Sequence, residues 1–263
     1  MRPIITLTTD YGTNDHFVGA MKGVILNIHP EATIVDITHS VIPHDILDGA
    51  LAIGQVYKYF PPRTIHVVVV DPGVGTARRP ILVAGDTHYF VAPDNGVLSV
   101  IYDQSEAIHA WHITSEHYFL SPVSTTFHGR DIFAPVAGWL SKSWQTQAFG
   151  EEITDQVRFA IPKPKAAGTG IKGVVLRVDH FGNLITNITP EDAPALVAPE
   201  GKFTIRAGNA EIRKVLQNYA QGAAGEPFGV IGSTGFLELS VNKGSAAKTL
   251  AAARGAEVTV EAG

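Results

Sequence analysis

Four consecutive valines, Val67–Val70, constrain the fold of this chain more than any other stretch. A run without a polar face predicts a strand that is buried on both sides, as at the centre of a parallel sheet. The strand should end at Asp71-Pro72-Gly73, because proline lacks an N–H and glycine permits a sharp turn. Ligands bind outside the carboxyl ends of such strands. Asp71 and the later Arg78 are therefore candidates for chemistry, unless Asp71 only caps a turn and Arg78 is a solvated charge.

Strands and helices alternate through residues 1–161, which predicts an N-terminal Rossmann-like α/β/α domain with a mostly parallel sheet. The expected strands are Ile4–Thr8, Thr33–Ile37, Thr64–Val70, Ile81–Ala84, His88–Ala92 and Ala107–Ile113. The expected helices are Phe17–Ile28 (capped by Asp15), Ile46–Phe60, Val97–Tyr102 and Ile132–Ser141. The first and third strands each end at an acidic residue, Asp10 and Asp71.

The chain changes character after residues 162–170, which contain proline, lysine, alanine and glycine and are predicted to form a linker. Short β-type runs split by turns follow in residues 171–263, and they predict a smaller β-rich domain, either a sandwich or a barrel. Its expected strands are Val174–Val178, Phe203–Ala207, Glu211–Val215, Phe228–Ile231, Phe236–Val241 and Glu257–Val260, with a short helix at Ala246–Ala253.

Composition narrows the class of protein. A hydrophobic content of 45% over 263 residues is enough for a substantial core. The chain has no cysteine, which excludes disulfides and thiolate sites and suits a reducing cytoplasm. The net charge of −5, without a basic run, does not favour a nucleic-acid partner. The N-terminal apolar run is too short for a signal peptide and no other run could span a bilayer, so we expect a soluble cytoplasmic protein.

Two polar residues of the first domain are candidates for a ligand site. Asp10 follows the first strand, where its carboxylate can grip a ribose diol, bind a metal ion or cap a turn. Asp15 and His16 are close in sequence, but there is no His-x-His or His-Glu-x-x-His motif, so we do not expect a metal site. His128 stands where a loop meets a helix, and N–H groups point outward from such a junction.

The second domain offers two further candidates. Asn183 lies in a polar segment and can both donate and accept hydrogen bonds, as the edge of adenine requires, and Phe181 offers a face for stacking. A β-bulge or an Asx turn would explain the same segment. The turn Gly232–Gly235 carries hydroxyl and N–H groups that could take a carboxylate, or it is an ordinary hairpin loop.

Five motifs, in this order along the chain, resemble one family, the S-adenosyl-L-methionine hydroxide adenosyltransferases, which are related to the fluorinating and chlorinating enzymes. They are Thr9-Asp10-Tyr11-Gly12, Val70-Asp71-Pro72-Gly73-Val74-Gly75 with Arg78, Pro93-Asp94-Asn95-Gly96, Phe127-His128-Gly129-Arg130-Asp131 and Asp179-His180-Phe181-Gly182-Asn183. The resemblance covers essentially the whole chain. It implies an α/β domain, a C-terminal β-barrel-like domain and a homotrimer whose active sites lie between subunits.

The resemblance also implies roles for particular residues. Asp71, Arg78 and His128 match the catalytic set of the hydrolytic branch. The halogenating branch has a tyrosine at the position of Asp71, and its fluorinating enzymes have a serine at the position of Gly129, so this chain departs from halide chemistry.

For the substrate, the resemblance assigns Asp10 to the ribose, Asn183 to adenine and Asp179 to the methionine amine. Tyr11 is also expected among the substrate-binding residues. Ser233 matches the serine that binds the methionine carboxylate, with Thr234 where the fluorinating enzymes have arginine. Phe181 is expected to bind the substrate as a stacking face. At the walls around the sulfonium, Tyr219 stands where the fluorinating enzymes have an aromatic residue and His44 where they have a tryptophan.

The expected reaction is a nucleophilic substitution, in which water or hydroxide attacks C5′ of S-adenosyl-L-methionine and releases adenosine and L-methionine. It needs no cofactor or metal; its main requirement is a water held in line with the C5′–S bond. Two alternatives stay open: a halide-using, chlorinase-like transferase of the same fold, and a non-catalytic sensor that binds adenosine or S-adenosyl-L-methionine.

Overall fold

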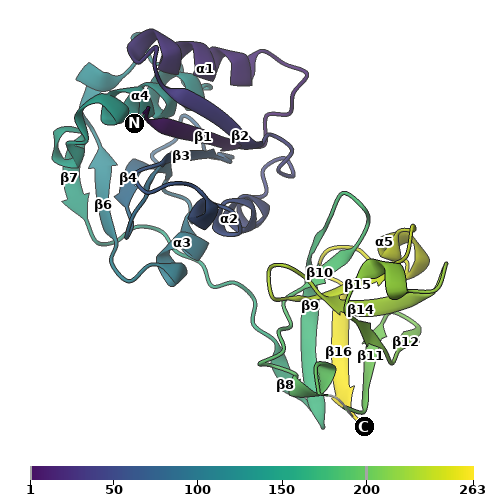
Figure 1. Ribbon diagram of the computed structural model, residues 1–263. Coiled ribbons are helices and arrows are strands. Elements are labelled where there is room, and N and C mark those ends of the chain that lie inside the picture. The colour runs from purple at the N-terminus through teal and green to yellow at the C-terminus, as the bar shows by residue number, and fades with distance from the viewer. Residues whose placement is uncertain (1, 199–200) are drawn as a thin grey trace. The chain divides into compact units, whose positions relative to one another are not determined.

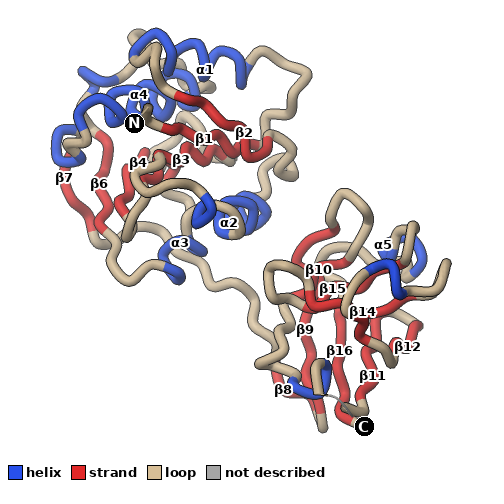
Figure 2. Tube along the Cα trace, viewed as in Figure 1, coloured by secondary structure: helices blue, strands red, loops and turns tan. Residues whose placement is uncertain are grey.

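The computed structural model describes residues 2–198 and 201–263. The chain divides into two compact units, Met1–Ile161 and Pro162–Gly263 (Figure 1). The first unit mixes helices and strands, whereas the second consists mainly of strands and loops (Figure 2). None of the helices in the described residues is both long and apolar enough to cross a membrane.

The first unit is built on a seven-stranded sheet in the order β2-β1-β3-β5-β4-β6-β7. Its strands are β1 (Ile4–Thr9), β2 (Thr33–Thr38), β3 (Ile65–Val69), β4 (Pro80–Ala84), β5 (Tyr89–Pro93), β6 (His109–Ile113) and β7 (Gly150–Ile153). Strands β2, β1, β3 and β5 pair in parallel, while the pairs β5–β4, β4–β6 and β6–β7 are antiparallel. Only β4 and β7 therefore run against the direction shared by the other strands. The expected mostly parallel sheet is confirmed.

Helices cover both faces of this sheet (Figure 1). They are α1 (Phe17–Ile28), α2 (Ile46–Gly54), α3 (Ser99–Gln104) and α4 (Ala134–Ser143). The valine run lies in the sheet's interior, and its alternate side chains point to opposite faces. Val67 and Val69 pack in one core with α1 and α4, whereas Val68 and Val70 pack in another with α2 and α3. Two buried faces explain why the run contains no polar residue.

Several local expectations for the first unit were wrong. Asp15 does not cap α1, since the residue at the N-cap is His16 and no side chain bonds there. Helix α2 stops at Gly54, and a 3₁₀ turn at Tyr57–Tyr59 follows before the chain reaches its proline pair. The helix expected from Ile132 begins instead as a π-helical turn, η3 (Gly129–Phe133), that continues into α4.

The second unit is a curled half-barrel, which bears out the expected barrel-like domain. Its strand order is β12-β11-β16-β9-β10-β15-β14-β13, with β8 paired to β9. The strands are β8 (Lys165–Ala167), β9 (Gly170–Val178), β10 (Leu184–Thr186), β11 (Phe203–Ala207), β12 (Ala210–Ile212), β13 (Val215–Leu216), β14 (Pro227–Ile231), β15 (Leu237–Val241) and β16 (Glu257–Ala262). Its core is closed by apolar residues from most of these strands and from α5 (Ala246–Thr249).

Two segments of this unit differ from expectation. Part of the segment expected to be a linker, residues 162–170, forms a hairpin, because β8 pairs antiparallel with the start of β9. The alanine-rich helix is also shorter than expected. Ser245 caps it through the Lys248 N–H, and it ends at Thr249.

Candidate active site

Asp10 lies where β1 ends, and neighbouring backbone holds it in place. Its Oδ2 accepts a hydrogen bond of 2.9 Å from the N–H of His44, and the Gly12 N–H donates to the carbonyl of His39 at 2.7 Å. His44 lies in the loop between β2 and α2 and has a φ of 66°, which is a left-handed conformation. In this conformation its N–H donates to Asp10. Parallel strands place their carboxyl ends at one edge of the sheet, so Asp10 and Asp71 belong to the same edge.

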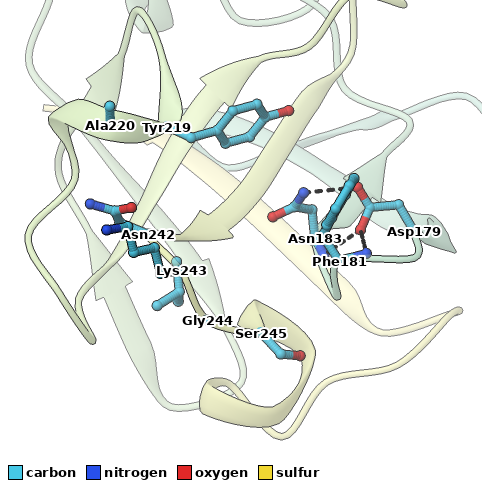
Figure 3. A pocket seen from close by; sticks show the side chains of 10 residues that line it. Asp179, Phe181, Asn183, Tyr219, Ala220, Asn242, Lys243, Gly244 and Ser245 are labelled. Atoms are coloured by element: carbon cyan, nitrogen blue, oxygen red, sulfur yellow. Dashed lines mark hydrogen bonds between the residues drawn. The ribbon is translucent and has the colours of Figure 1, made fainter.

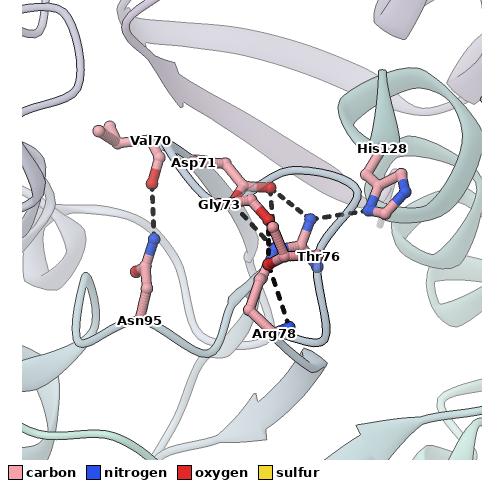
Figure 4. Close-up of polar contacts among 7 residues, drawn as sticks. All are labelled: Val70, Asp71, Gly73, Thr76, Arg78, Asn95 and His128. Carbon is pink, nitrogen blue, oxygen red and sulfur yellow. Dashed lines mark hydrogen bonds and ion pairs between the residues drawn. The ribbon is translucent and has the colours of Figure 1, made fainter. Parts of the chain in front are cut away.

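Asp71, Arg78 and His128 form one contact cluster, although 50 residues separate Arg78 from His128 (Figure 4). Arg78 Nε donates to both Asp71 oxygens, at 2.9 and 3.0 Å, and its Nη2 contacts Oδ2. The same Nη2 lies 2.8 Å from His128 Nδ1. Both members of the ion pair are nearly enclosed, with side-chain exposures of 9% for Arg78 and 4% for Asp71.

The hydrogen bond from Arg78 determines the tautomer of His128. A guanidinium has only donors, so Nδ1 must carry the lone pair and the ring proton lies on Nε2. Burial, and then the nearby charge of Arg78, lower the pKa of His128 below its ordinary value. The imidazole is therefore neutral near pH 7, and its free nitrogen is a donor.

One donor of the cluster has no protein partner. Arg78 Nη1 is buried, and the described residues offer it no hydrogen-bond acceptor. Burying an unpaired N–H of a charged group costs free energy, so such a donor is normally satisfied by a ligand or water. The cluster thus presents a donor at Arg78 and an acceptor-only carboxylate at Asp71.

The turn that carries Asp71 and Arg78 is fixed by contacts that need these residue types. Asn95 Nδ2 donates to the carbonyl of Val70 at 2.8 Å, and Thr76 Oγ1 donates to the carbonyl of Gly73 at 2.7 Å (Figure 4). Gly75 has a φ of 77°, and a β-carbon there would lie 2.2 Å from the carbonyl oxygen of Thr125. Only glycine fits this position, which accounts for the second glycine of the Gly-x-Gly pattern.

Tyr11 adjoins this cluster. Its hydroxyl would lie 2.6 Å from a β-carbon built at Gly129, so it fills the space beside the start of η3. Burial, followed by the charges of Asp10 and Asp71, raises the pKa of Tyr11, which keeps the hydroxyl protonated. The first unit therefore brings the predicted Tyr11 next to the predicted catalytic set.

A second group of predicted residues lies in the second unit, around a pocket of about 680 Å³ (Figure 3). Phe181 is 75% exposed and Tyr219 45% exposed, which leaves two aromatic faces open in one pocket. Asp179 and Asn183 also line it, so the structure brings four of the residues assigned to the substrate together. Ser233 and Thr234 are exposed in the turn between β14 and β15 and do not line this pocket.

Asp179 organises the turn that presents Asn183. Its Oδ1 accepts from the N–H groups of Phe181 and Asn183 at 2.9 and 2.8 Å, and its Oδ2 accepts from Asn183 Nδ2 at 2.8 Å. This is the Asx-type turn that the sequence left open as an alternative. Asn183 is buried, and its amide oxygen has no hydrogen bond within the turn. The turn and the ligand site are thus compatible explanations of the same segment.

The sequence did not single out several residues at these sites. The segment Asn242–Ser245 lines the pocket of the second unit, and Glu238 accepts a 2.8 Å hydrogen bond from the Tyr219 hydroxyl. The turn signal at Asn242-Lys243-Gly244 could have identified the first. Nothing in the sequence identifies Glu238, because its place depends on how β15 pairs.

The described residues contain no group of three or more histidine, aspartate or glutamate side chains that could hold a metal ion.

Two domain families match the chain. They are described as the SAM hydroxide adenosyltransferase N-terminal domain, which matches residues 5–150, and the SAM hydroxide adenosyltransferase C-terminal domain, which matches residues 173–259.

The chain is also similar to named proteins. A protein from Salinispora tropica named (R)-S-adenosyl-L-methionine hydrolase is 36% identical over 99% of this chain and 98% of its own length. One of the same name from Methanocaldococcus jannaschii is 35% identical, covering 94% and 91%. A fluorinase from an Actinoplanes species is 29% identical, covering 98% and 97%. A solved structure of an uncharacterised conserved protein from Thermotoga maritima has a TM-score of 0.91 at 35% identity, covering 98% and 99%.

Proposed function

The chain belongs to the SAM hydroxide adenosyltransferase family, and we propose that it hydrolyses S-adenosyl-L-methionine to adenosine and L-methionine. The oxygen of water forms a bond to C5′ of the ribose as the C5′–S bond breaks. The electron pair of that bond goes to sulfur, so methionine leaves as a neutral thioether and needs no general acid. The remaining task is to hold and deprotonate the water.

The buried Asp71–Arg78–His128 cluster carries this proposal. The cluster offers water two kinds of partner: donors at Arg78 Nη1 and His128 Nε2, and the acceptor-only carboxylate of Asp71. Arg78 stays protonated, and the Nδ1 lone pair of His128 is taken by Arg78. Asp71 is therefore the member able to accept the proton. When a hydroxide-like oxygen attacks C5′ of the sulfonium substrate, its negative charge and the positive charge on sulfur cancel. A site that contains little water favours such a step.

We assign the remaining predicted residues to the substrate. Asp10, with Tyr11, takes the ribose hydroxyls, because a carboxylate is acceptor-only and matches a vicinal diol. Asn183, with the open faces of Phe181 and Tyr219, takes adenine. Asp179, Ser233 and Thr234 serve the methionine part.

Assembly is part of the same proposal. The candidate residues are divided between the two units, and the family resemblance implies a homotrimer in which each active site combines units of neighbouring subunits. We also propose that the reaction takes place in the cytoplasm and uses no cofactor.

Isotope labelling tests the reaction. In ¹⁸O-labelled water the label should enter the 5′-hydroxyl of adenosine and leave methionine unlabelled, as mass spectrometry of both products would show. Asp71→Asn should slow the reaction by roughly 10² or more, the usual size of a positioned acid–base contribution. The matched control is Asp155→Asn, which changes an exposed aspartate that pairs with Arg79.

Other products would contradict the proposal. Label in methionine, or methylthioadenosine as the main product, would exclude attack at C5′. A halogenated nucleoside formed with added chloride would favour the halide-using alternative, and binding without any product would favour a sensor. The relatives named hydrolase, at 32–36% identity, are nearer to this chain than the fluorinase from Actinoplanes at 29%, which supports the hydrolase.

A further inference from the structure

Glu238 is a buried carboxylate without a cationic partner. Only 6% of the residue is exposed, and it lies on β15 with Val230 and Ile185 as its neighbours across the sheet. Its Oε2 accepts a hydrogen bond from the Tyr219 hydroxyl at 2.8 Å. In the described part of the chain it has no ion pair. Buried carboxylates are normally paired with a cation, so Glu238 is an exception that requires an explanation.

The backbone around Glu238 is shaped to admit its carboxylate. A β-carbon at Gly232 would lie 1.8 Å from Glu238 Oε1, so the glycine leaves room for the side chain in its present position. Gly232 begins the turn that contains Ser233 and Thr234. Tyr219, which holds the other carboxylate oxygen, lines the pocket with Asp179 and Asn183. The carboxylate therefore lies between that turn and the pocket.

The surroundings of Glu238 favour a positively charged ligand. Burial and the negative charge of Asp179 raise the pKa of Glu238, despite the opposing hydrogen bond from Tyr219. A cation would relieve both effects. Asp179 also lines the pocket, and three donors of its own turn bind its oxygens.

We propose that Glu238, held by Tyr219, is the binding site for the primary ammonium group of an α-amino acid. In S-adenosyl-L-methionine the α-amino acid is the methionine part, so this inference rests on the proposed function. The hydroxyl and N–H groups of the turn beside Gly232 are then the partners of the amino acid's carboxylate. Asp179, which the proposed function assigns to the methionine part, also positions Asn183.

Calorimetric binding of two ligands tests the site. The first is S-adenosyl-L-methionine, and the second is its analogue that lacks only the amino group. Glu238→Gln keeps the shape and removes the charge, so it should weaken binding of the first ligand about tenfold or more, the scale of a hydrogen bond to a charged group. Binding of the second ligand should be the same in the variant and the wild type. The matched control, Glu226→Gln, changes an exposed glutamate that pairs with Lys214 and should alter neither affinity.

The outcomes separate this inference from the proposed function. An equal loss for both ligands would mean that Glu238 only supports the fold, and no loss for either would remove it from the site. Either result would overturn the inference even if the wild type produces adenosine. If the wild type produces no adenosine but binds with the expected dependence on Glu238 and the amine, only the hydrolase proposal fails.

Discussion

At the residue scale, the hydrogen bond between Arg78 and His128 makes the activity depend on pH. It requires a neutral imidazole, and the pKa of His128 is already lowered from 6.5 by burial and by Arg78. Once the pH falls below that lowered value, His128 Nδ1 becomes protonated and can no longer accept the hydrogen bond from Arg78. The imidazolium then faces the guanidinium, and the two positive charges repel each other. We expect kcat/KM to decline on the acid side with an apparent pKa below 6.5, in a pH–rate profile.

The matched variant for this prediction is His128→Gln. Its amide oxygen can accept from Arg78 but does not titrate, so the acid limb should disappear from a slower enzyme. A limb that persists in this variant, or one centred above 6.5 in the wild type, would assign the pH dependence to another group.

The contact between Tyr11 and Gly129 gives a second prediction at this scale. A methyl group at residue 129 would collide with the Tyr11 hydroxyl at 2.6 Å, so Gly129→Ala should destabilise the fold by about 1–3 kcal/mol, as overpacking does. Adding Tyr11→Phe should recover much of this loss. Urea unfolding of the single and double variants measures both effects.

Gly19→Ala serves as the control for that series. It lies in α1, and a β-carbon there meets nothing within 4 Å, so the change should be neutral or mildly stabilising. If Gly129→Ala behaved like Gly19→Ala, the close contact with Tyr11 would be absent in solution.

At the scale of elements, the sequence predicted those whose signal is local. The valine run identified β3 because both of its faces are buried, and helical periodicity identified α1 and α2. Strands such as β7 and β10 were not expected, since they are only four and three residues long and are defined by their pairing with β6, and with β9 and β15, respectively. The same reason explains why Glu238 escaped notice.

Strand β3 also contains a buried histidine that should affect acid stability. His66 is fully buried, its Nδ1 lies 2.7 Å from Thr6 Oγ1, and its ring stacks on Phe90. Burial lowers the pKa of His66 to about 3. In the unfolded chain it takes up a proton near pH 6.5, so the free energy of unfolding should fall as the pH drops from there toward 3. The slope from this group is up to about 1.4 kcal/mol per pH unit.

Replacing His66 should flatten this dependence. His66→Gln can still bond Thr6 but does not titrate, so the free energy of unfolding, measured by urea at several pH values, should vary less between pH 6 and 4. The control is His109→Gln, at an exposed position where the side chain is 62% accessible. An unchanged slope in His66→Gln would show that other groups determine acid unfolding.

At the scale of the whole molecule, the candidate residues form two groups that the chain holds in separate units. Sequence order alone could not show that Arg78 reaches His128, or that Tyr219 shares a pocket with Asn183, because both pairings depend on tertiary structure. What the motifs did provide was the set of residues, through their resemblance to one family. The proposed homotrimer predicts that one chain does not complete a site by itself.

A mixing experiment can answer it. Asp71→Ala disables the first unit and Asn183→Ala the second, so each variant alone should be nearly inactive. If every site joins the first unit of one subunit to the second unit of its neighbour, co-expressed variants with different tags will form some intact sites. In a trimer that contains both variants, one site of the three joins two intact units, so the doubly tagged pool should regain about a third of wild-type activity.

The control combines two lesions in the same unit, Asp71→Ala with Asp10→Ala. Every site then contains a damaged first unit whatever its neighbour supplies, so activity should stay at the level of the single variants. Recovery in the first mixture but not in this one requires sites shared between subunits. No recovery in a doubly tagged oligomer, or an active monomer in light scattering, would place the whole site within one chain and contradict the proposed trimer.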